Sequence, residues 1–158
     1  DIFAKCQRLV LALLEAKDTP AFYAALELSF KRDFKCQAYS LIVFDDKAMQ
    51  INHFTYSLPE SDAREHVGAL IKSKKPTLGV LRSSERDFLF RQASEKVQSA
   101  AVMSVRAPSK TAGGGEQIAL LAIGSIDPNY FQAGMGTLFI GFIADVLARQ
   151  LPSHLTPH

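Results

Sequence analysis

Apolar and polar positions separate most clearly in the last quarter of the chain. Residues 120–123 are an uninterrupted apolar run, which is typical of a strand covered on both faces. Asp127 and Pro128 end this run, because proline cannot donate to a strand ladder and fixes its own φ. Beyond them, apolar residues recur at helical spacing at Leu138, Phe139, Phe142, Ile143, Val146 and Leu147. Residues 120–151 therefore predict a buried strand, a tight turn and a long amphipathic helix.

The pattern over residues 1–34 predicts two helices. Apolar residues at steps of three and four predict an amphipathic helix over residues 1–17. The chain begins at Asp1 without Met and enters this helix at once, so we expect the helix to continue a longer upstream segment. Thr19 as N-cap and Pro20 at the first helical position predict a second helix over residues 20–34.

The middle of the chain predicts strands with helices inserted between them. Residues 39–44 are rich in strand formers, residues 45–47 resemble a hairpin turn, and residues 49–56 form a more polar return strand. A helix over 62–73, a short strand over 76–81 and a helix capped by Ser83 or Ser84 follow, with Asp87 completing a capping box. Two further strands, 98–106 and 116–125, flank a glycine-rich loop.

This order of elements predicts an α+β domain. Six residues are expected to lie buried in its central strands: Leu41, Val43, Val102, Leu120, Ala122 and Ile123. A length of 158 residues fits about one domain with a substantial core.

Composition narrows the class of protein. A formal net charge of +2 argues against a dedicated nucleic-acid-binding domain, which usually carries a strong basic excess. No apolar run reaches the roughly 18 residues of a membrane span, so no membrane partner is expected. Cys6 and Cys36 lie far apart without a C-x-x-C motif, which favours a cytoplasmic protein with two free thiols.

A set of motifs in the second half of the chain resembles a known family. The set comprises Gly124, Ser125, Asp127, Phe131, Gly134, Met135, Gly136 and Thr137, with Leu81, Arg82, Phe88, Leu89 and Phe90 upstream. Together they resemble the bacterial domain-of-unknown-function family four-eight-four, which is similar to GAF domains.

The resemblance implies a fold but no activity, ligand or cofactor. The implied fold is a GAF-like antiparallel sheet of about five strands, with the terminal helices on one face and the inserted helices and loops on the other. The expected division is an N-terminal helix over residues 1–18, a GAF-like domain over 19–151 and a tail over 152–158.

Two glycine motifs invite a phosphate-binding interpretation and do not support it. Gly134 and Gly136 precede a helix, but the third position of the dinucleotide fingerprint is Phe139. We therefore expect Gly136 to serve close packing of the helix start. The run 113–115 is followed by a strand and lacks Gly-Lys-Ser/Thr, so it predicts a hairpin turn.

One polar cluster is the candidate ligand site. Arg82, Ser83, Ser84 and Arg86 surround a predicted helix N-terminus, where free N–H groups and a guanidinium can bind an anion. Phe88 and Met103 would supply the apolar part of the site. Simple capping with surface arginines is the alternative interpretation. The ligand would be small and either anionic or mixed polar and apolar.

The sequence predicts neither catalysis nor a metal site. His53, His66, His154 and His158 lack metal-binding spacing, and no serine stands in a nucleophile elbow. Two hypotheses remain. The first is a ligand-binding sensory module that signals through its terminal helices, and the second is a ligand-free interaction or dimerisation module.

A homodimer through residues 1–17 and 138–149 is expected. The first helix carries two apolar stripes, of which one is enough to dock it on the domain. The alternative is that residues upstream of Asp1 cover the second stripe.

Overall fold

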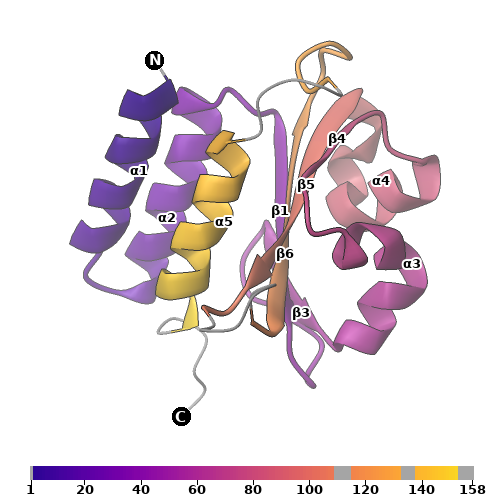
Figure 1. Cartoon of the computed structure of the whole chain (residues 1–158), viewed down its shortest axis with the longest axis horizontal. Coiled ribbons are helices and arrows are strands. Elements are labelled where there is room, and N and C mark those ends of the chain that lie inside the picture. Colours follow the sequence, from indigo (N-terminus) through magenta and orange to yellow (C-terminus); the bar gives the residue numbers. More distant parts are fainter. Residues whose placement is uncertain (1, 109–114, 133–137, 153–158) are drawn as a thin grey trace.

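A six-stranded sheet forms the middle layer of the molecule, and helices cover both of its faces (Figure 1). The computed structural model describes residues 2–108, 115–132 and 138–152. The strand order is β2-β3-β1-β6-β5-β4. The strands are β1 (Ala38–Phe44), β2 (Met49–Gln50), β3 (Thr55–Leu58), β4 (Thr77–Gly79), β5 (Ser99–Arg106) and β6 (Gln117–Ser125).

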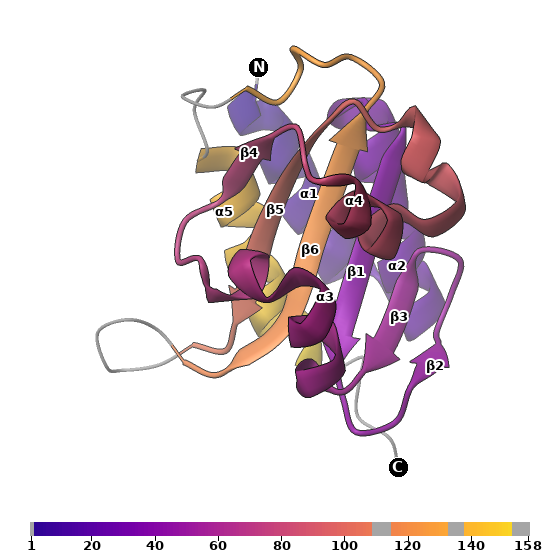
Figure 2. The same cartoon turned by 90° about the vertical axis from the view of Figure 1, so that its right-hand side faces the viewer.

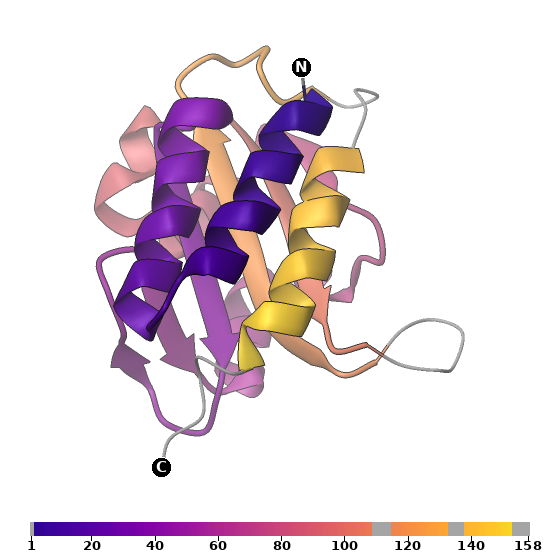
Figure 3. The same cartoon turned by 90° about the vertical axis from the view of Figure 1, so that its left-hand side faces the viewer.

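The terminal helices form one outer layer. Helices α1 (Ile2–Glu15), α2 (Thr19–Leu28) and α5 (Leu138–Gln150) lie side by side over the sheet (Figure 3). They pack on the strand residues Leu41, Val43, Leu121 and Ile123. Helix α1 buries Leu9 and Leu13 in this same core, so it is packed on the domain.

The second helix differs in detail from its prediction. Asp18 caps it by accepting a hydrogen bond from the Ala21 N–H at 2.8 Å, so the cap lies one residue before the predicted Thr19. A π-helical segment, Ser29–Asp33, then replaces the predicted last turns of α-helix. Single π-helical turns often occur near functional sites.

The inserted segments cover the opposite face. They are α3 (Glu60–Lys72), α4 (Ser83–Phe90) and the 3₁₀ segment Arg91–Lys96 (Figure 2). Their buried side chains pack on Ile42, Val102, Leu120 and Ala122. The expected GAF-like layering is therefore confirmed, and so is the burial of all six residues assigned to the central strands.

The predicted hairpin between residues 39–44 and 49–56 is wrong. Strand β3 pairs with β1 in parallel, and β2 pairs only with β3. The return strand is broken because Asn52 forms a turn, in which its side-chain oxygen accepts from the Phe54 N–H at 3.0 Å. The chain thus reverses twice, and β3 enters the sheet between β1 and β2.

The predicted capping box at α4 is also wrong. Arg82 is the N-cap residue, and its N–H donates to the Glu85 carboxylate at 3.4 Å. Asp87 instead accepts a hydrogen bond from the Ser94 hydroxyl. Glu85 can complete the capping box because it is the third residue of a helix that begins at Ser83.

Among the described glycines, Gly124 is the one whose backbone packs closely against neighbouring side chains. A Cβ atom there would lie 2.9 Å from Val97 Cγ2 and 3.2 Å from Phe90 Cζ. Gly134 and Gly136, together with the proposed packing role of Gly136, lie outside the described residues, as do Gly113 and Gly114.

Gly124→Ala is expected to lower the free energy of unfolding by about 1–3 kcal/mol, the usual cost of adding a methyl group to a packed core. Val97 is β-branched and cannot rotate away freely. Urea denaturation measures the change. Gly68→Ala in α3 is the control, since the nearest atom to its new Cβ would be 4.0 Å away. Equal effects of the two substitutions would contradict the close approach at Gly124.

Candidate functional site

The predicted polar site at the start of α4 is a solvent-exposed helix terminus. Ser83 and Ser84 are exposed, and the Arg82 side chain is 79% exposed with its Nε 3.9 Å from Glu85. Arg86 is half-buried and donates from Nε to the Ser94 hydroxyl at 3.2 Å. Arg82 and Arg86 thus contact polar side chains of their own segment.

The two predicted apolar site residues lie on opposite faces of the sheet. Phe88 packs with the inserted layer and stacks on His66 at 4.5 Å between ring centroids. Met103 packs with the terminal-helix layer, because alternate residues of a strand point to opposite faces. The six predicted residues therefore do not surround one cavity.

A different pocket lies beside the first half of β1. It has a volume of about 580 Å³, which is within the range of small-molecule sites. We call it the β1-edge pocket. Its walls come from β1, from the turn between β2 and β3, and from the junction of α4 with the 3₁₀ segment. Its polar lining residues are Gln37, Tyr39, Ser40, Gln50, His53, Tyr56, Arg91 and Gln92, and its apolar ones are Ala38, Phe54, Leu89, Phe90 and Ala93.

The sheet is open at this point because β3 is shorter than β1. Pairing between the two strands begins at Leu41, whose N–H donates to the Phe54 carbonyl at 2.9 Å. Backbone groups alternate in direction along a strand, so those of Tyr39 point to the same side as those of Leu41. Within the described residues no strand pairs with Tyr39 on that side.

Ser40 has a buried hydroxyl without a hydrogen-bond partner among the described residues. Ser40 is among the residues that line the pocket, and the residue as a whole is only 2% exposed. Leaving such a group unpaired costs about 1–3 kcal/mol.

Arg91 adopts a backbone conformation that glycine prefers. Its φ is 52° and its ψ is −117°, at the point where α4 gives way to the 3₁₀ segment. A residue other than glycine is held in such a conformation at a cost of about 1–3 kcal/mol. The guanidinium carbon lies 3.7 Å from the centroid of the Tyr56 ring, which is a cation–π contact.

The Glu27 carboxylate of α2 makes polar contacts with two residues of the pocket wall. The Tyr39 hydroxyl donates to Glu27 Oε2, and His53 Nε2 lies 2.6 Å from the same oxygen. Burial alone would raise the pKa of Glu27, but these hydrogen bonds outweigh it and hold that pKa below its ordinary value. Burial and the neighbouring carboxylate raise the pKa of Tyr39. Glu27 therefore connects the pocket wall to the terminal-helix layer.

A larger and more apolar hollow, which we call the helix groove, lies between α1 and α5. Its volume is about 860 Å³. It is lined by Phe3, Cys6, Gln7, Val10, Leu11, Pro76, Phe139, Gly141, Phe142 and Asp145. Phe3 is 71% exposed and Phe142 is 41% exposed, so the groove presents aromatic side chains to solvent.

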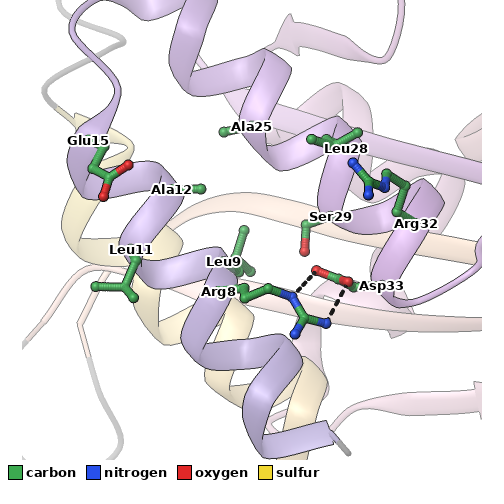
Figure 4. A pocket seen from close by; sticks show the side chains of 10 residues that line it. All are labelled: Arg8, Leu9, Leu11, Ala12, Glu15, Ala25, Leu28, Ser29, Arg32 and Asp33. Carbon is green, nitrogen blue, oxygen red and sulfur yellow. Dashed lines mark hydrogen bonds and ion pairs between the residues drawn. The ribbon is translucent and has the colours of Figure 1, made fainter.

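A third hollow, of about 300 Å³, lies between α1 and the end of α2 (Figure 4). The Arg8 guanidinium crosses it to the Asp33 carboxylate at 2.8 Å. Ser29 lines it with a buried hydroxyl that also has no partner among the described residues. Since this hollow is about half as large and its Arg8 is already paired, the β1-edge pocket is the better candidate site.

Within the described ranges, no three His, Cys, Asp or Glu side chains gather closely enough to hold a metal ion. No helix in the described part of the chain is long and apolar enough to cross a membrane. Cys6 and Cys36 are buried free thiols, and burial raises the pKa of Cys36 to about 12.

Comparison of the fold identifies its class. The structure is similar to a crystal structure described as the GAF domain of nlh2 from A. Aeolicus in an inactive state, with a TM-score of 0.57. The match covers 96% of this chain and 96% of that one at 9% identity, so it shows the fold alone. The chain is a GAF-like domain.

Its family follows from the sequence. The family model described as "Protein of unknown function, DUF484" matches residues 1–156, and the chain belongs to that family. The resemblance inferred from the G-S-x-D and G-M-G-T motifs is therefore confirmed. No curated protein matches the sequence.

Proposed function

We propose that this protein is a sensory or regulatory GAF-like module that binds a small molecule in the β1-edge pocket. The observation that carries the proposal is that Ser40, a residue lining a 580 Å³ pocket, has a buried hydroxyl that is unpaired among the described residues. Buried polar groups in native proteins are normally hydrogen-bonded. A ligand that pairs with Ser40 would satisfy this requirement.

The signal would pass to the terminal helices through Glu27. Tyr39 and His53 line the pocket and both bond to this carboxylate of α2. A ligand that draws either side chain towards the pocket would weaken its bond to Glu27. Because Glu27 belongs to α2, a change in this contact would act directly on the terminal-helix layer.

We propose binding rather than catalysis. Neither the GAF-like fold nor a family of unknown function supplies an activity. Both thiols are buried, and a raised pKa keeps them in the unreactive thiol form. Buried, unpaired thiols of this kind fit a cytoplasmic protein.

Native mass spectrometry of the purified protein tests the proposal. We expect a bound small molecule in the wild type and its loss in Gln92→Trp, which places a large ring at the pocket wall. Gln98→Trp is the control, because Gln98 is also exposed and is not among the residues that line the pocket. A bound mass that persists in Gln92→Trp would contradict the proposed site. So would a wild-type protein that stays ligand-free after incubation with the small-molecule fraction of a cell extract.

Ser40→Ala is expected to raise the free energy of unfolding of the ligand-free protein by about 1 kcal/mol, because it removes a buried group that has no partner. The same substitution at Ser99 should have the opposite sign. Ser99 is 1% exposed, donates to the Asp127 carbonyl at 2.6 Å and accepts from the Phe131 N–H at 3.2 Å. Urea denaturation of both variants measures the two changes in the free energy of unfolding. Destabilisation by Ser40→Ala would show that its hydroxyl is already satisfied.

We propose as the second candidate that the protein is a homodimer that pairs through α1 and α5. The helix groove favours this role, because one patch carries both a hollow and the exposed rings of Phe3 and Phe142. A twofold interface uses the same patch on both copies, so it needs protrusions and hollows together. Asp145 is the charged residue that lines the groove, and a net charge of +2 leaves little repulsion between copies.

A further inference from the structure

We propose that the ligand of the β1-edge pocket is a small carboxylate that also carries a secondary amide, such as an N-acylated amino acid. This inference rests on the proposed function and adds the chemical class of the ligand. Three features of the pocket carry it: an unpaired stretch of strand edge, an exposed guanidinium that stacks on Tyr56, and the absence of acidic residues from the lining.

The amide follows from the open edge of β1. Tyr39 presents one N–H and one C=O towards the pocket side, because its backbone groups point the same way as those of Leu41. A secondary amide carries one donor and one acceptor, so an extended ligand can pair with Tyr39 as a strand would. Phe54 and His53 close the end of this edge where β3 begins.

The carboxylate follows from the charges around the pocket. Arg91 lines it, whereas no Asp or Glu is among its lining residues. The nearby Glu27 carboxylate is engaged by Tyr39, His53 and, at 3.6 Å, by Lys31. A ligand that enters the pocket therefore meets positive charge and neutral donors.

The geometry of Arg91 suits a planar anion. Tyr56 covers one face of the guanidinium, and the N–H groups make no hydrogen bond or ion pair with the described residues. These N–H groups can form two parallel hydrogen bonds with a carboxylate.

The strain at Arg91 is the reason to assign this residue a role in binding. Glycine would adopt a φ of 52° and a ψ of −117° without cost, so the backbone alone gives no reason for an arginine here. Strained residues of this kind cluster at ligand sites. The unpaired hydroxyl of Ser40, which lines the same pocket, is a second observation that fits a polar ligand.

The test is an NMR titration of the ¹⁵N-labelled full chain with N-acetyl-L-alanine. We expect the amide signals of Tyr39, Ser40 and Arg91 to shift with saturation. Arg91→Gly should weaken binding by about tenfold or more, the loss of a charge-assisted pair, while its melting temperature stays the same or rises. Lys35→Gly is the matched control. Lys35 is the other described non-glycine residue with a positive φ, also 52°, and it lies outside the pocket. Its replacement should leave binding unchanged.

Two further probes separate the parts of the inference. Equal binding of the uncharged N-acetyl-L-alanine N-methylamide would overturn the carboxylate, and equal binding of inorganic phosphate would overturn the amide. If no probe shifts the pocket signals at tens of millimolar, the ligand class is wrong. In each of these cases, loss of the bound mass in Gln92→Trp would still support the proposed function. Persistence of that mass would contradict both the proposed function and the ligand class.

Discussion

Replacing Ile123 by alanine is expected to lower the free energy of unfolding by about 2–5 kcal/mol, the usual range for large-to-small changes in a core. Ile123 is fully buried in β6, where it faces the terminal helices. Leu120 in the same strand is fully buried against the inserted layer, so Leu120→Ala should have a similar cost. The two substitutions therefore probe the two cores separately.

Urea denaturation measures both changes. Ile126→Ala is the matched control, since Ile126 follows β6 directly and is 55% exposed. Its effect should stay within about 0.5 kcal/mol, as is usual for surface positions. A change below about 0.5 kcal/mol at Ile123 as well would mean that β6 does not form the centre of the sheet.

Strand β6 could be predicted because its signal is local. It lies in the middle of the sheet with helices over both faces, so each of its central residues is apolar. The same feature explains the error at Met103. In a strand covered on both faces the apolar positions do not alternate, so the sequence does not show which way a given side chain points. Met103 and Val102 look alike as core residues, yet they belong to different layers.

The pairing of β1 with β3 could not be predicted in this way. Strand β2 has two residues, too few to show any period, and the parallel register depends on tertiary contacts that a local pattern does not show. The turn at Asn52 was the one local sign that the return strand is broken.

The β1-edge pocket, which we propose as the site, could not be predicted for a similar reason. The sequence drew attention to Arg82, Ser83 and Ser84, which are adjacent in the chain and form a recognisable helix start. The β1-edge pocket instead joins Tyr39, His53 and Arg91 from three separate segments. None of them stands in a motif, and neither the burial of Ser40 nor the backbone strain at Arg91 can be seen before the chain is folded.

The helix groove gives the prediction with the largest effect on assembly. In sedimentation equilibrium at tens of micromolar, the wild-type chain is expected to behave as a species of about twice 17.4 kDa. Phe142→Asp should weaken this association by roughly 100-fold, because a central aromatic contact is lost and an unpaired carboxylate would be buried. Phe142 is 41% exposed in the single chain, so its replacement should leave the fold intact.

Val80→Asp is the control for added charge alone. Val80 is 76% exposed, lies between β4 and α4 and is not among the residues that line the groove. It should leave the dimer unchanged, and circular dichroism melts of both variants should match the wild type. A wild-type species near 17.4 kDa at these concentrations would exclude the dimer. An equal loss of association in both variants would instead place the contact between copies outside the helix groove.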